Sequence, residues 1–520
     1  MGITQCVKRA DRHNQHGRAT IFGSRTHRWG KFAARVARLA GGLRALGVES
    51  GDRVAILSLN SDRYLEIYVA VPWAGAVIVP LTIRWSPSEN IYALSDSGAR
   101  VLFVDDTFGA QAASFRAEIS SVRVIIHMGD AAASAGMISY EHLIESSVPF
   151  PDAGRTGEDL AGIFYTGGTT GFPKGVMLAH RSLFASANSI KGLLPALTRD
   201  ATFLHAAPMF HIADFASTML ALLVGAENAI IPSFSAERVL TAIQEHSVTD
   251  ILLVPTMIHM LVTHPALEKT DLSSLQHVIY GGSPMPEEIL RHSIRVLPQC
   301  QFIQLYGQTE LSPVATALPP EYHTFEGPTA GKLNSAGRAV SNCEVEVVDA
   351  NGVEVPLGAV GEIRVRGLNT MLGYWNKSEE TAAAFRDGWV YTGDAGRMDK
   401  DGFLYIVDRI KDVIISGGEN IYTVEVENAC VKHPAVAQCA VIGIPDDTWG
   451  EAVHAIVILK DGQHVLAEDL IAHCHGLIAG YKCPRSVEYR SQPFPLTGAG
   501  KVLKRELRAS HWEGRSRQVN

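Results

Sequence analysis

Short, uniformly apolar runs recur through the first three hundred residues, and they constrain the fold of this chain more than any other feature. Runs bounded by turn-forming residues include Val101–Val104, Val122–Ile126, Ile251–Val254 and Val278–Tyr280. A strand with one face in solvent alternates apolar and polar residues, whereas a strand covered on both faces can be apolar throughout. Between such runs, apolar residues recur at helical spacing, as from Val36 to Leu46. The pattern predicts an α/β fold with mostly parallel sheets flanked by helices.

The sequence pattern changes after about residue 336. Short strands of alternating polarity, such as Glu344–Val347 and Ile363–Arg366, are separated by turn signals such as Asn351-Gly352, and they predict a small antiparallel β subdomain. A strand is expected at Asp412–Ile415, followed by new strand and helix patterns. We therefore expect a domain boundary near Lys411, between an N-terminal domain of residues 1–410 and a C-terminal domain of residues 411–520. A chain of 520 residues also exceeds the usual size of a single core.

A loop rich in glycine and threonine follows the strand-like run Ala161–Tyr165. The loop reads Thr166-Gly167-Gly168-Thr169-Thr170-Gly171-Phe172-Pro173-Lys174-Gly175. Its amides, hydroxyls and single cation can all bind phosphate, and α/β sheets bind nucleotides at the ends of strands. The Walker motif is absent because Gly175, not Ser or Thr, follows Lys174, and the glycine spacing does not match a dinucleotide-binding fingerprint. The loop therefore predicts ATP binding through a different motif.

Six motifs in a fixed order resemble the signature of the adenylate-forming superfamily, which includes acyl-CoA synthetases, luciferases and the adenylation domains of peptide synthetases. The motifs are the loop at 165–175, Tyr306–Glu310, Tyr391–Asp394, Asp408–Asp412, Ser416–Asn420 and Pro495–Lys501. Together they fit acyl-CoA synthetases best. The resemblance implies a small α+β C-terminal domain that rotates about a hinge. It also implies that ATP converts a carboxylic acid to an acyl adenylate, from which a thiol displaces AMP.

The resemblance also implies which residues bind the nucleotide and its metal ion. The expected ATP and AMP ligands are Thr166, Gly167, Gly168, Thr169, Thr170, Gly171, Lys174, Gly282, Ser283, Pro284, Tyr306, Gly307, Thr309, Asp394 and Arg409. The glycine-rich loop would hold the β and γ phosphates, Tyr306 would stack on adenine, and Asp394 would bind the ribose hydroxyls. Mg²⁺ prefers carboxylates beside phosphate oxygens, so Glu310 is its expected ligand, together with Thr170. Gly168 departs from the family pattern, since most members have Ser there and some fatty-acid ligases have Gly.

Catalytic groups are expected in both predicted domains. They are Lys501, Glu310, Thr309 and His211. In the family, the residue that matches Lys501 reaches the acid's carboxylate and the bridging oxygen of ATP. Rotation about a hinge at Lys411 would withdraw Lys501 and bring in residues that line a tunnel for the pantetheine arm of CoA. The expected tunnel residues are Gly417, Gly418 and Glu419.

The residues His211, Met209, Phe210 and Phe215 resemble the acyl pocket of the family, with His211 at the gating position. The expected pocket is apolar, and the leading interpretation, to which Gly168 also points, is an ATP- and CoA-dependent ligase that acts on a medium- or long-chain fatty acid. Two alternatives stay open. The acid is an aryl acid of the cinnamate or benzoate type, or the enzyme loads a carrier protein, although no carrier domain follows Lys501 in the sequence.

Composition narrows the partners and the compartment. A net charge of −8 argues against a nucleic-acid partner. Seven cysteines without a C-x-x-C pair give neither a disulfide framework nor a zinc module, and His473-Cys474-His475 is interpreted as part of a surface helix. The longest apolar run, Val69–Leu81, is too short to cross a bilayer and contains two prolines. We expect a cytoplasmic protein without an integral membrane segment whose partners are a carboxylic acid, ATP and CoA; whether it forms a homodimer stays open.

Overall fold

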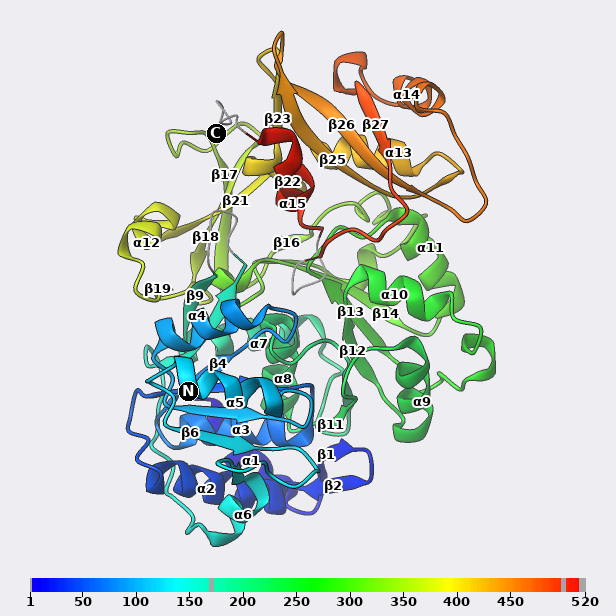
Figure 1. The fold of residues 1–520 in the computed structure, drawn as a ribbon. Helices are drawn as coiled ribbons and strands as arrows, with labels where there is room; N and C mark the ends of the chain where they lie inside the picture. The colour runs from blue at the N-terminus through cyan, green and yellow to red at the C-terminus, as the bar shows by residue number, and fades with distance from the viewer. Residues whose placement is uncertain (1, 168–172, 497–501, 514–520) are drawn as a thin grey trace. The chain divides into compact units, whose positions relative to one another are not determined.

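The computed structural model describes residues 2–167, 173–496 and 502–513 (Figure 1). The chain divides into two compact units. The first comprises Met1–Val345 and Val365–Val390, and the second comprises Glu346–Arg364 and Tyr391–Asn520. The boundary that we expect near Lys411 is defined by rotation about a hinge, which a division into compact units does not test. It stays a prediction.

An eight-stranded sheet in the first unit carries the predicted phosphate loop. Its strand order is β19 (Gly373–Tyr374), β9 (Lys174–Ala179), β8 (Leu160–Thr166), β4 (Val77–Pro80), β3 (Arg53–Leu57), β5 (Val101–Val104), β6 (Val124–His127) and β7 (Ile138–Ser139). The strands from β8 to β7 in this order are parallel, whereas β9 is antiparallel to both of its neighbours. Its helices are α2 (Trp29–Ala45), α3 (Asp62–Trp73), α4 (Pro87–Ser97), α5 (Gly109–Glu118) and α6 (Tyr140–Ser146).

A nine-stranded sheet forms the other half of the first unit. Its order is β16 (Arg338–Ala339), β15 (Thr316–Leu318), β14 (Gln301–Tyr306), β13 (His277–Gly281), β12 (Asp250–Leu253), β10 (Thr202–His205), β11 (Glu227–Ile230), β1 (Arg18–Phe22) and β2 (Arg25–Arg28). The strands from β14 to β1 are parallel. The accompanying helices are α1 (Ile3–Asn14), α7 (His180–Leu193), α8 (Ile212–Val224), α9 (Ala236–His246), α10 (Pro255–Val262) and α11 (Glu287–Val296), with 3₁₀ turns η1 (Leu267–Lys269), η2 (Thr309–Leu311) and η3 (Pro320–Tyr322).

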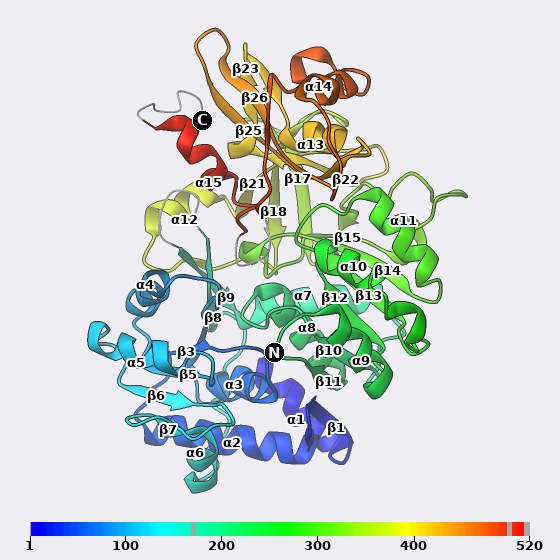
Figure 2. The ribbon, with the colours of Figure 1, turned by 45° about the vertical axis from the view of Figure 1, so that its right-hand side comes forward.

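Helices α7 and α8 lie between the two sheets (Figure 2). Leu183 and Phe215 on these helices pack into the core shared with β8 and β9, and Ile190 and Leu220 pack into the core under β10, β13 and β14. Strands between these layers contact apolar atoms on both faces, so their sequences do not alternate between apolar and polar residues. The predicted α/β fold with mostly parallel sheets is confirmed.

A five-stranded sheet follows in sequence. It contains β17 (Cys343–Val348), β18 (Gly361–Gly367), β21 (Trp389–Met398) and β20 (Phe385–Arg386) in this order, with β22 (Leu404–Arg409) also paired to β21. The pairs β20–β21 and β21–β22 are antiparallel, as the alternating sequence pattern predicts. Helix α12 (Ser378–Ala384) precedes β20.

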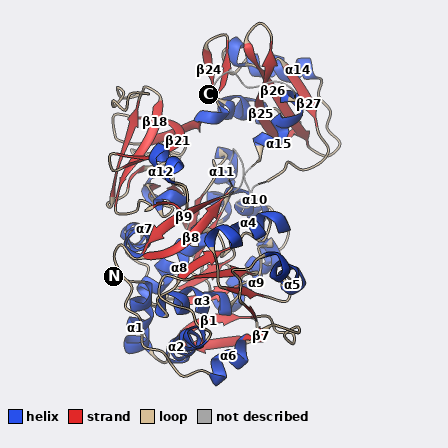
Figure 3. Cartoon of the chain, turned by 60° about the vertical axis from the view of Figure 1, so that its left-hand side comes forward, coloured by secondary structure: helices blue, strands red, loops and turns tan. Residues whose placement is uncertain are grey.

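The C-terminal sheet has the order β24 (Glu419–Ile421), β23 (Ile414–Ser416), β26 (Gly450–Leu459) and β25 (Val436–Asp446), with β27 (Ser486–Tyr489) parallel to β26. The helical segments are η4 (Ile410–Asp412), α13 (Thr423–Val431), α14 (Ala467–His475), η5 (Gly480–Lys482), α15 (Lys504–Ala509) and η6 (Ser510–Trp512) (Figure 3). The strand predicted at Asp412–Ile415 begins later, at Ile414, because a 3₁₀ turn occupies Ile410–Asp412.

Candidate active site

The phosphate loop connects two antiparallel strands. Strand β8 ends at Thr166 and β9 begins at Lys174, and the two residues are paired across the antiparallel ladder. The Thr166 hydroxyl donates a hydrogen bond to the carbonyl oxygen of Lys174 at 3.5 Å. Gly168, Thr169, Thr170 and Gly171 lie outside the described residues. The described part therefore brings Thr166, Gly167 and Lys174 together at one end of the sheet.

Tyr374 connects two residues that the sequence assigns to phosphate and metal binding. Its hydroxyl donates a hydrogen bond to Glu310 Oε1 at 2.9 Å, and Lys174 Nζ lies 5.2 Å from the centre of its ring. Burial and then the Glu310 carboxylate raise the pKa of Tyr374, so its hydroxyl keeps the proton that it donates. Strand β19 holds Tyr374 in place through its pairing with Val176 of β9. Lys174 and Glu310 thus lie close together although 136 positions separate them in the sequence.

Asp96, at the end of α4, holds the base of the phosphate loop. The Tyr165 hydroxyl donates a hydrogen bond to Asp96 Oδ2 at 2.6 Å, and the Trp375 indole N–H donates to the Asp96 carbonyl oxygen at 2.9 Å. These bonds join the residue before Thr166 to the residue after Tyr374. No sequence motif indicated Asp96 or Tyr374; the Gly-Tyr-Trp triplet at 373–375 is the only local signal near them.

The predicted adenine wall lies where two neighbouring parallel strands end. Strand β13 ends at Gly281, which pairs with Leu305 near the end of β14. A Cβ on Gly281 would lie 2.2 Å from the Leu305 carbonyl oxygen, so the two strand ends can approach this closely only with glycine. Gly282, Ser283 and Pro284 directly follow β13, and Tyr306 ends β14, which leads through Gly307 to the buried Thr309. Ligands bind at the carboxyl ends of strands in open α/β sheets.

The second unit contains the residues expected at the ribose and at the hinge. Asp394 and Arg409 are paired across β21 and β22, and Arg409 Nε lies 3.5 Å from Asp394 Oδ1. Lys411 follows in η4, where burial and then the Arg409 charge lower its pKa to about 8. Of the expected tunnel residues, Gly417 and Gly418 form the turn between β23 and β24, and Glu419 begins β24. Lys501 lies outside the described residues.

The residues expected to form the acyl pocket are buried in the first unit. Met209 and Phe215 are at most 1% exposed, and Phe210 is 6% exposed. The Phe215 ring packs against Tyr68 and Phe164, with ring centres 4.5 and 5.2 Å away. His211 is the N-cap of α8, where its Nδ1 accepts a hydrogen bond from the Ala213 amide at 3.2 Å. The structure therefore gives His211 a helix-capping role, and its gating role stays a prediction.

A buried polar cluster that the sequence did not indicate lies beside this aromatic group. His205 Nδ1 lies 3.0 Å from Asp214 Oδ2, and His205 Nε2 lies 3.0 Å from Asn228 Oδ1. The Asn228 amide nitrogen donates to the carbonyls of Ala19 and Ala226, so its oxygen must accept from His205. Burial lowers the pKa of His205, but the Asp214 carboxylate outweighs burial and raises it overall. The geometry therefore fits an imidazolium paired with Asp214, which anchors the first turn of α8 behind His211.

A second buried histidine makes the stability of the protein dependent on pH. His323 Nδ1 donates to the Pro319 carbonyl and Nε2 accepts from the Tyr280 hydroxyl, so the ring is neutral. Burial lowers its pKa to about 4, against an ordinary value of 6.5. Between these values the unfolded chain binds a proton that the native state does not, so stability falls as the pH drops from 6.5 towards 4.

We expect His323→Gln to flatten part of this acid dependence, because glutamine can keep both hydrogen bonds without titrating. Between pH 7 and pH 5 the variant should lose roughly 2 kcal/mol less of its free energy of unfolding than the wild type. Urea unfolding at pH 7 and pH 5 measures it, with the exposed His464→Gln as the matched control. Buried His180, whose pKa burial also lowers to about 4, leaves a residual slope in the variant. Equal slopes for His323→Gln and the wild type would contradict the assignment.

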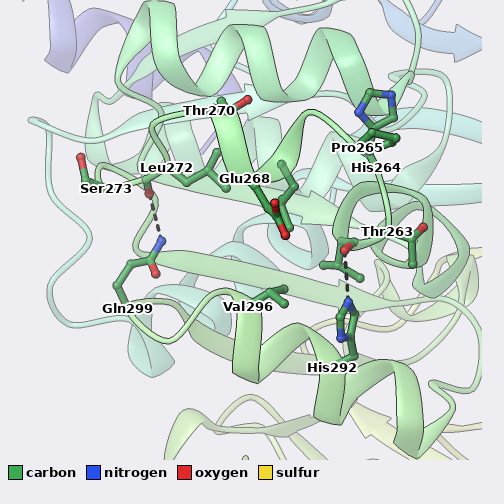
Figure 4. A pocket seen from close by; sticks show the side chains of 12 residues that line it. Thr263, His264, Pro265, Glu268, Thr270, Leu272, Ser273, His292, Val296 and Gln299 are labelled. Atoms are coloured by element: carbon green, nitrogen blue, oxygen red, sulfur yellow. Dashed lines mark hydrogen bonds between the residues drawn. The ribbon is translucent and has the colours of Figure 1, made fainter.

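A surface cavity of about 1000 Å³ opens beside α10, η1 and α11 (Figure 4). Two of its polar side chains are bonded to the backbone: His292 Nε2 donates to the Val262 carbonyl at 3.2 Å, and the Gln299 amide donates to the Leu272 carbonyl at 3.0 Å. None of the residues predicted to bind ATP, the acid or CoA lines it. We do not assign the active site to this cavity.

Comparison with known proteins identifies the family of this chain. Residues 7–375 match the model of the AMP-binding enzyme family, and residues 425–501 match the model of the AMP-binding enzyme C-terminal domain. The chain is 40% identical to a feruloyl-CoA synthase from an Amycolatopsis species, over 96% of this chain and 97% of that protein. It is 36% identical to the fatty acid–[acyl-carrier-protein] ligase ScoC of Streptomyces coeruleorubidus, over 93% of this chain and 91% of that protein.

A solved structure of a CoA synthetase has the same fold. The o-succinylbenzoate CoA synthetase of Bacillus subtilis, in complex with its acyl-adenylate intermediate, superposes with a TM-score of 0.84 at 30% identity, covering 96% of this chain and 97% of that one. Among the described residues, no helix has both the length and the apolar character needed to cross a bilayer. The chain belongs to the AMP-binding enzyme family and is an acid–thiol ligase of its acyl- and aryl-CoA ligase group.

Proposed function

We propose that the protein is an AMP-forming acyl-CoA synthetase that activates an aryl acid of the cinnamate type and transfers it to CoA. The observation that carries the proposal is the 40% identity, over nearly the whole of both chains, to a feruloyl-CoA synthase. The packing around the expected acyl pocket also supports it. Phe164, Phe215 and Tyr68 fill the space beside Met209, so a long alkyl chain would need a channel through packed rings. A flat aryl acid needs only a shallow pocket and can stack on ring edges.

The reaction takes place in two displacements. An oxygen of the carboxylate forms a bond to the α-phosphorus of ATP while the bond from that phosphorus to the bridging oxygen breaks, which releases pyrophosphate. The CoA thiol, after losing its proton, then forms a bond to the acyl carbon, and AMP leaves with the electrons of the cleaved C–O bond. In the first step Lys174 and Lys501 would neutralise charge on the departing phosphates, Thr166 would donate a hydrogen bond to them, and Thr309 would bind the α-phosphate.

The residues around Glu310 fit a magnesium ion. The Tyr374 hydroxyl holds Oε1, and Oε2 accepts no hydrogen bond from the described residues, so one carboxylate oxygen is available to a hard cation. Glu310 would hold Mg²⁺ together with Thr170, which lies outside the described residues. When bound, Mg²⁺ supplies charge neutralisation at the phosphate oxygens. Tyr374 fixes the rotamer of the ligand.

Tyr374→Phe should lower kcat/KM for adenylate formation roughly tenfold, because a hydrogen bond to a charged group contributes about 1.5 kcal/mol or more. The required Mg²⁺ concentration should rise in parallel, since Glu310 loses its fixed orientation. ATP–pyrophosphate exchange across a magnesium titration measures both quantities. Tyr489→Phe, at a 39% exposed tyrosine, is the matched control and should behave as the wild type. An unchanged magnesium requirement in Tyr374→Phe would contradict this role.

A pyrophosphate-release assay with a panel of acids tests the proposed substrate. The panel contains ferulate, cinnamate, benzoate, octanoate and palmitate, each with and without CoA. The proposal expects kcat/KM for hydroxycinnamates to exceed that for fatty acids at least about tenfold. A preference for octanoate or palmitate would instead establish the medium- or long-chain fatty acid that the sequence favours, which the similarity to the ScoC ligase supports. Product formation only with a carrier protein, and not with CoA, would identify a carrier-loading enzyme.

We also propose a cytoplasmic location. All seven cysteines are free thiols, including Cys430 and Cys474, whose sulfur atoms lie 3.6 Å apart, and this is typical of a reducing compartment. Cell fractionation tests the location, and light scattering of the purified protein would decide between monomer and homodimer.

A further inference from the structure

Three potential metal ligands meet on one face of the C-terminal sheet. His454 lies on β26, Glu488 on β27 and His511 on η6. His454 Nε2 lies 3.6 Å from Glu488 Oε2, and the His454 and His511 ring centres lie 4.9 Å apart. One ligand atom from each residue lies within 4.8 Å of the other two, and no other group of three or more such residues occurs among residues 2–167, 173–496 and 502–513. None of the three is among the residues expected to bind ATP, the acid or CoA.

Strand alternation brings these residues to the same side of the sheet. Val453, Ala455 and Val457 face the core formed with α13 and α14, whereas Ile456 packs with Leu507 of α15 on the opposite face. His454 has the same parity as Ile456 and therefore lies on the α15 side. The parallel pairing of β26 with β27 places Glu488 opposite Ile456.

The C-terminal end of the described chain brings His511 to this face. The Trp512 indole N–H donates to the Gly443 carbonyl of β25 at 3.0 Å, which fixes η6 against the sheet.

The surroundings of His454 leave one ring nitrogen without a hydrogen bond. Its side chain is buried, with 6% of the residue exposed, and Nδ1 lies 2.7 Å from the Ser486 hydroxyl oxygen. Nε2 makes no hydrogen bond to any described residue and lies beside Glu488 and His511. A buried polar atom without a partner costs free energy, and a metal ion would provide that partner. An Nδ1–H donated to Ser486 would leave the Nε2 lone pair directed at the site, as is usual for metal-bound histidine.

We infer that His454, Glu488 and His511 form a binding site for a divalent transition metal ion of the zinc type. Two imidazoles and one carboxylate suit Zn²⁺, Co²⁺ or Ni²⁺ and not the hard cations Mg²⁺ and Ca²⁺. Water would occupy the fourth position. The Glu488 side chain is 49% exposed and His511 is partly exposed. Both side chains can therefore move by roughly 1 Å, which brings their ligand atoms to the metal–ligand distance of about 2.1 Å.

An adjoining cavity gives the ion access to the site. The cavity measures about 260 Å³ and is lined by Glu488 and His511, together with the charged groups Arg490 and Glu506. The Arg490 guanidinium donates to the Gln492 carbonyl at 3.0 Å. The bound ion would tie η6 to β26 and β27 and so secure the segment that follows Lys501.

A cobalt titration of the full-length protein tests this site. After removal of any affinity tag and dialysis against a chelator, the wild type should bind one equivalent of Co²⁺ with visible d–d absorption, and Zn²⁺ should displace it. Glu488→Gln and His511→Asn should each weaken binding at least about tenfold. Both positions are partly exposed, so the variants should fold. His473→Asn is the matched control, because His473 also lies beside a second histidine, His433, with ring centres 5.1 Å apart.

The melting temperature provides a second readout. Zn²⁺ should raise it in the wild type and in His473→Asn, and should leave it unchanged in His511→Asn, since only a ligand that binds the native state stabilises it. Adenylate formation should be unaffected by His511→Asn under metal-free conditions. The inference fails if the wild type binds no Co²⁺ at micromolar to submillimolar concentration, or if His473→Asn loses the spectrum while His511→Asn retains it.

Discussion

Replacing Lys501 with alanine should slow adenylate formation about a hundredfold or more and leave transfer from a preformed adenylate to CoA near the wild-type rate. In the family, the matching lysine neutralises charge at the carboxylate and the bridging oxygen while the bond to pyrophosphate breaks. Loss of one such transition-state donor costs roughly 3 kcal/mol or more. The second step does not build charge at that position.

The segments on both sides of Lys501 should keep their structure in this variant. Leu496 and Val502 form a β-bridge, and the Leu503 amide donates to the Pro495 carbonyl at 2.8 Å. Lys504 is largely buried and its Nζ lies 2.7 Å from Glu427 Oε1. Removal of the Lys501 ammonium group therefore leaves these anchors in place.

Two half-reaction assays separate the effects of Lys501→Ala. ATP–pyrophosphate exchange reports adenylate formation, and thioester formation from synthetic acyl adenylate reports transfer. Lys460→Ala, which removes an exposed lysine from the same unit, is the control and should leave both rates unchanged. Equal damage to both half-reactions in Lys501→Ala would refute the assigned role.

Lys411→Pro should lower the rate of thioester formation by an order of magnitude or more, while adenylate formation continues. A hinge residue absorbs a large change in backbone dihedral angles, and proline fixes φ near −65° and removes the amide donor. Lys411 lies in a 3₁₀ turn between β22 and β23, next to the hydrogen bond from the Val413 amide to the Arg409 carbonyl at 3.1 Å. Such a short connection offers few other positions at which rotation can occur.

The alanine variant separates the backbone effect from the side-chain effect. Lys411→Ala removes the same ammonium group, whose pKa burial lowers to about 8. It leaves φ unrestricted and keeps the backbone N–H donor. We expect Lys411→Ala to transfer the acyl group to CoA much faster than Lys411→Pro. Single-turnover formation of acyl-CoA measures both variants. Full transfer activity in Lys411→Pro would rule out a hinge at this position.

The fold could be predicted where local pattern and burial agree. Val101–Val104 is strand β5 within the expected bounds, because a four-residue run of buried apolar residues needs no partner information to be recognised as a strand. Asp412–Ile415 was placed too early. The residues from Asp412 to Ile415 fit a strand pattern. The 3₁₀ turn at Ile410–Asp412 delays the strand to Ile414, and that turn depends on hydrogen bonds that a linear pattern does not reveal.

The sequence by itself determined the family, the order of the motifs and the α/β architecture, because each motif and each buried strand is recognised from a short run of neighbouring residues. The tertiary structure alone decided which side chains meet. Tyr374 reaches Glu310 across 64 positions, and His511 joins His454 across 57 positions. Such pairs form only when strands from distant parts of the chain are placed side by side, and neither periodicity nor spacing encodes that placement.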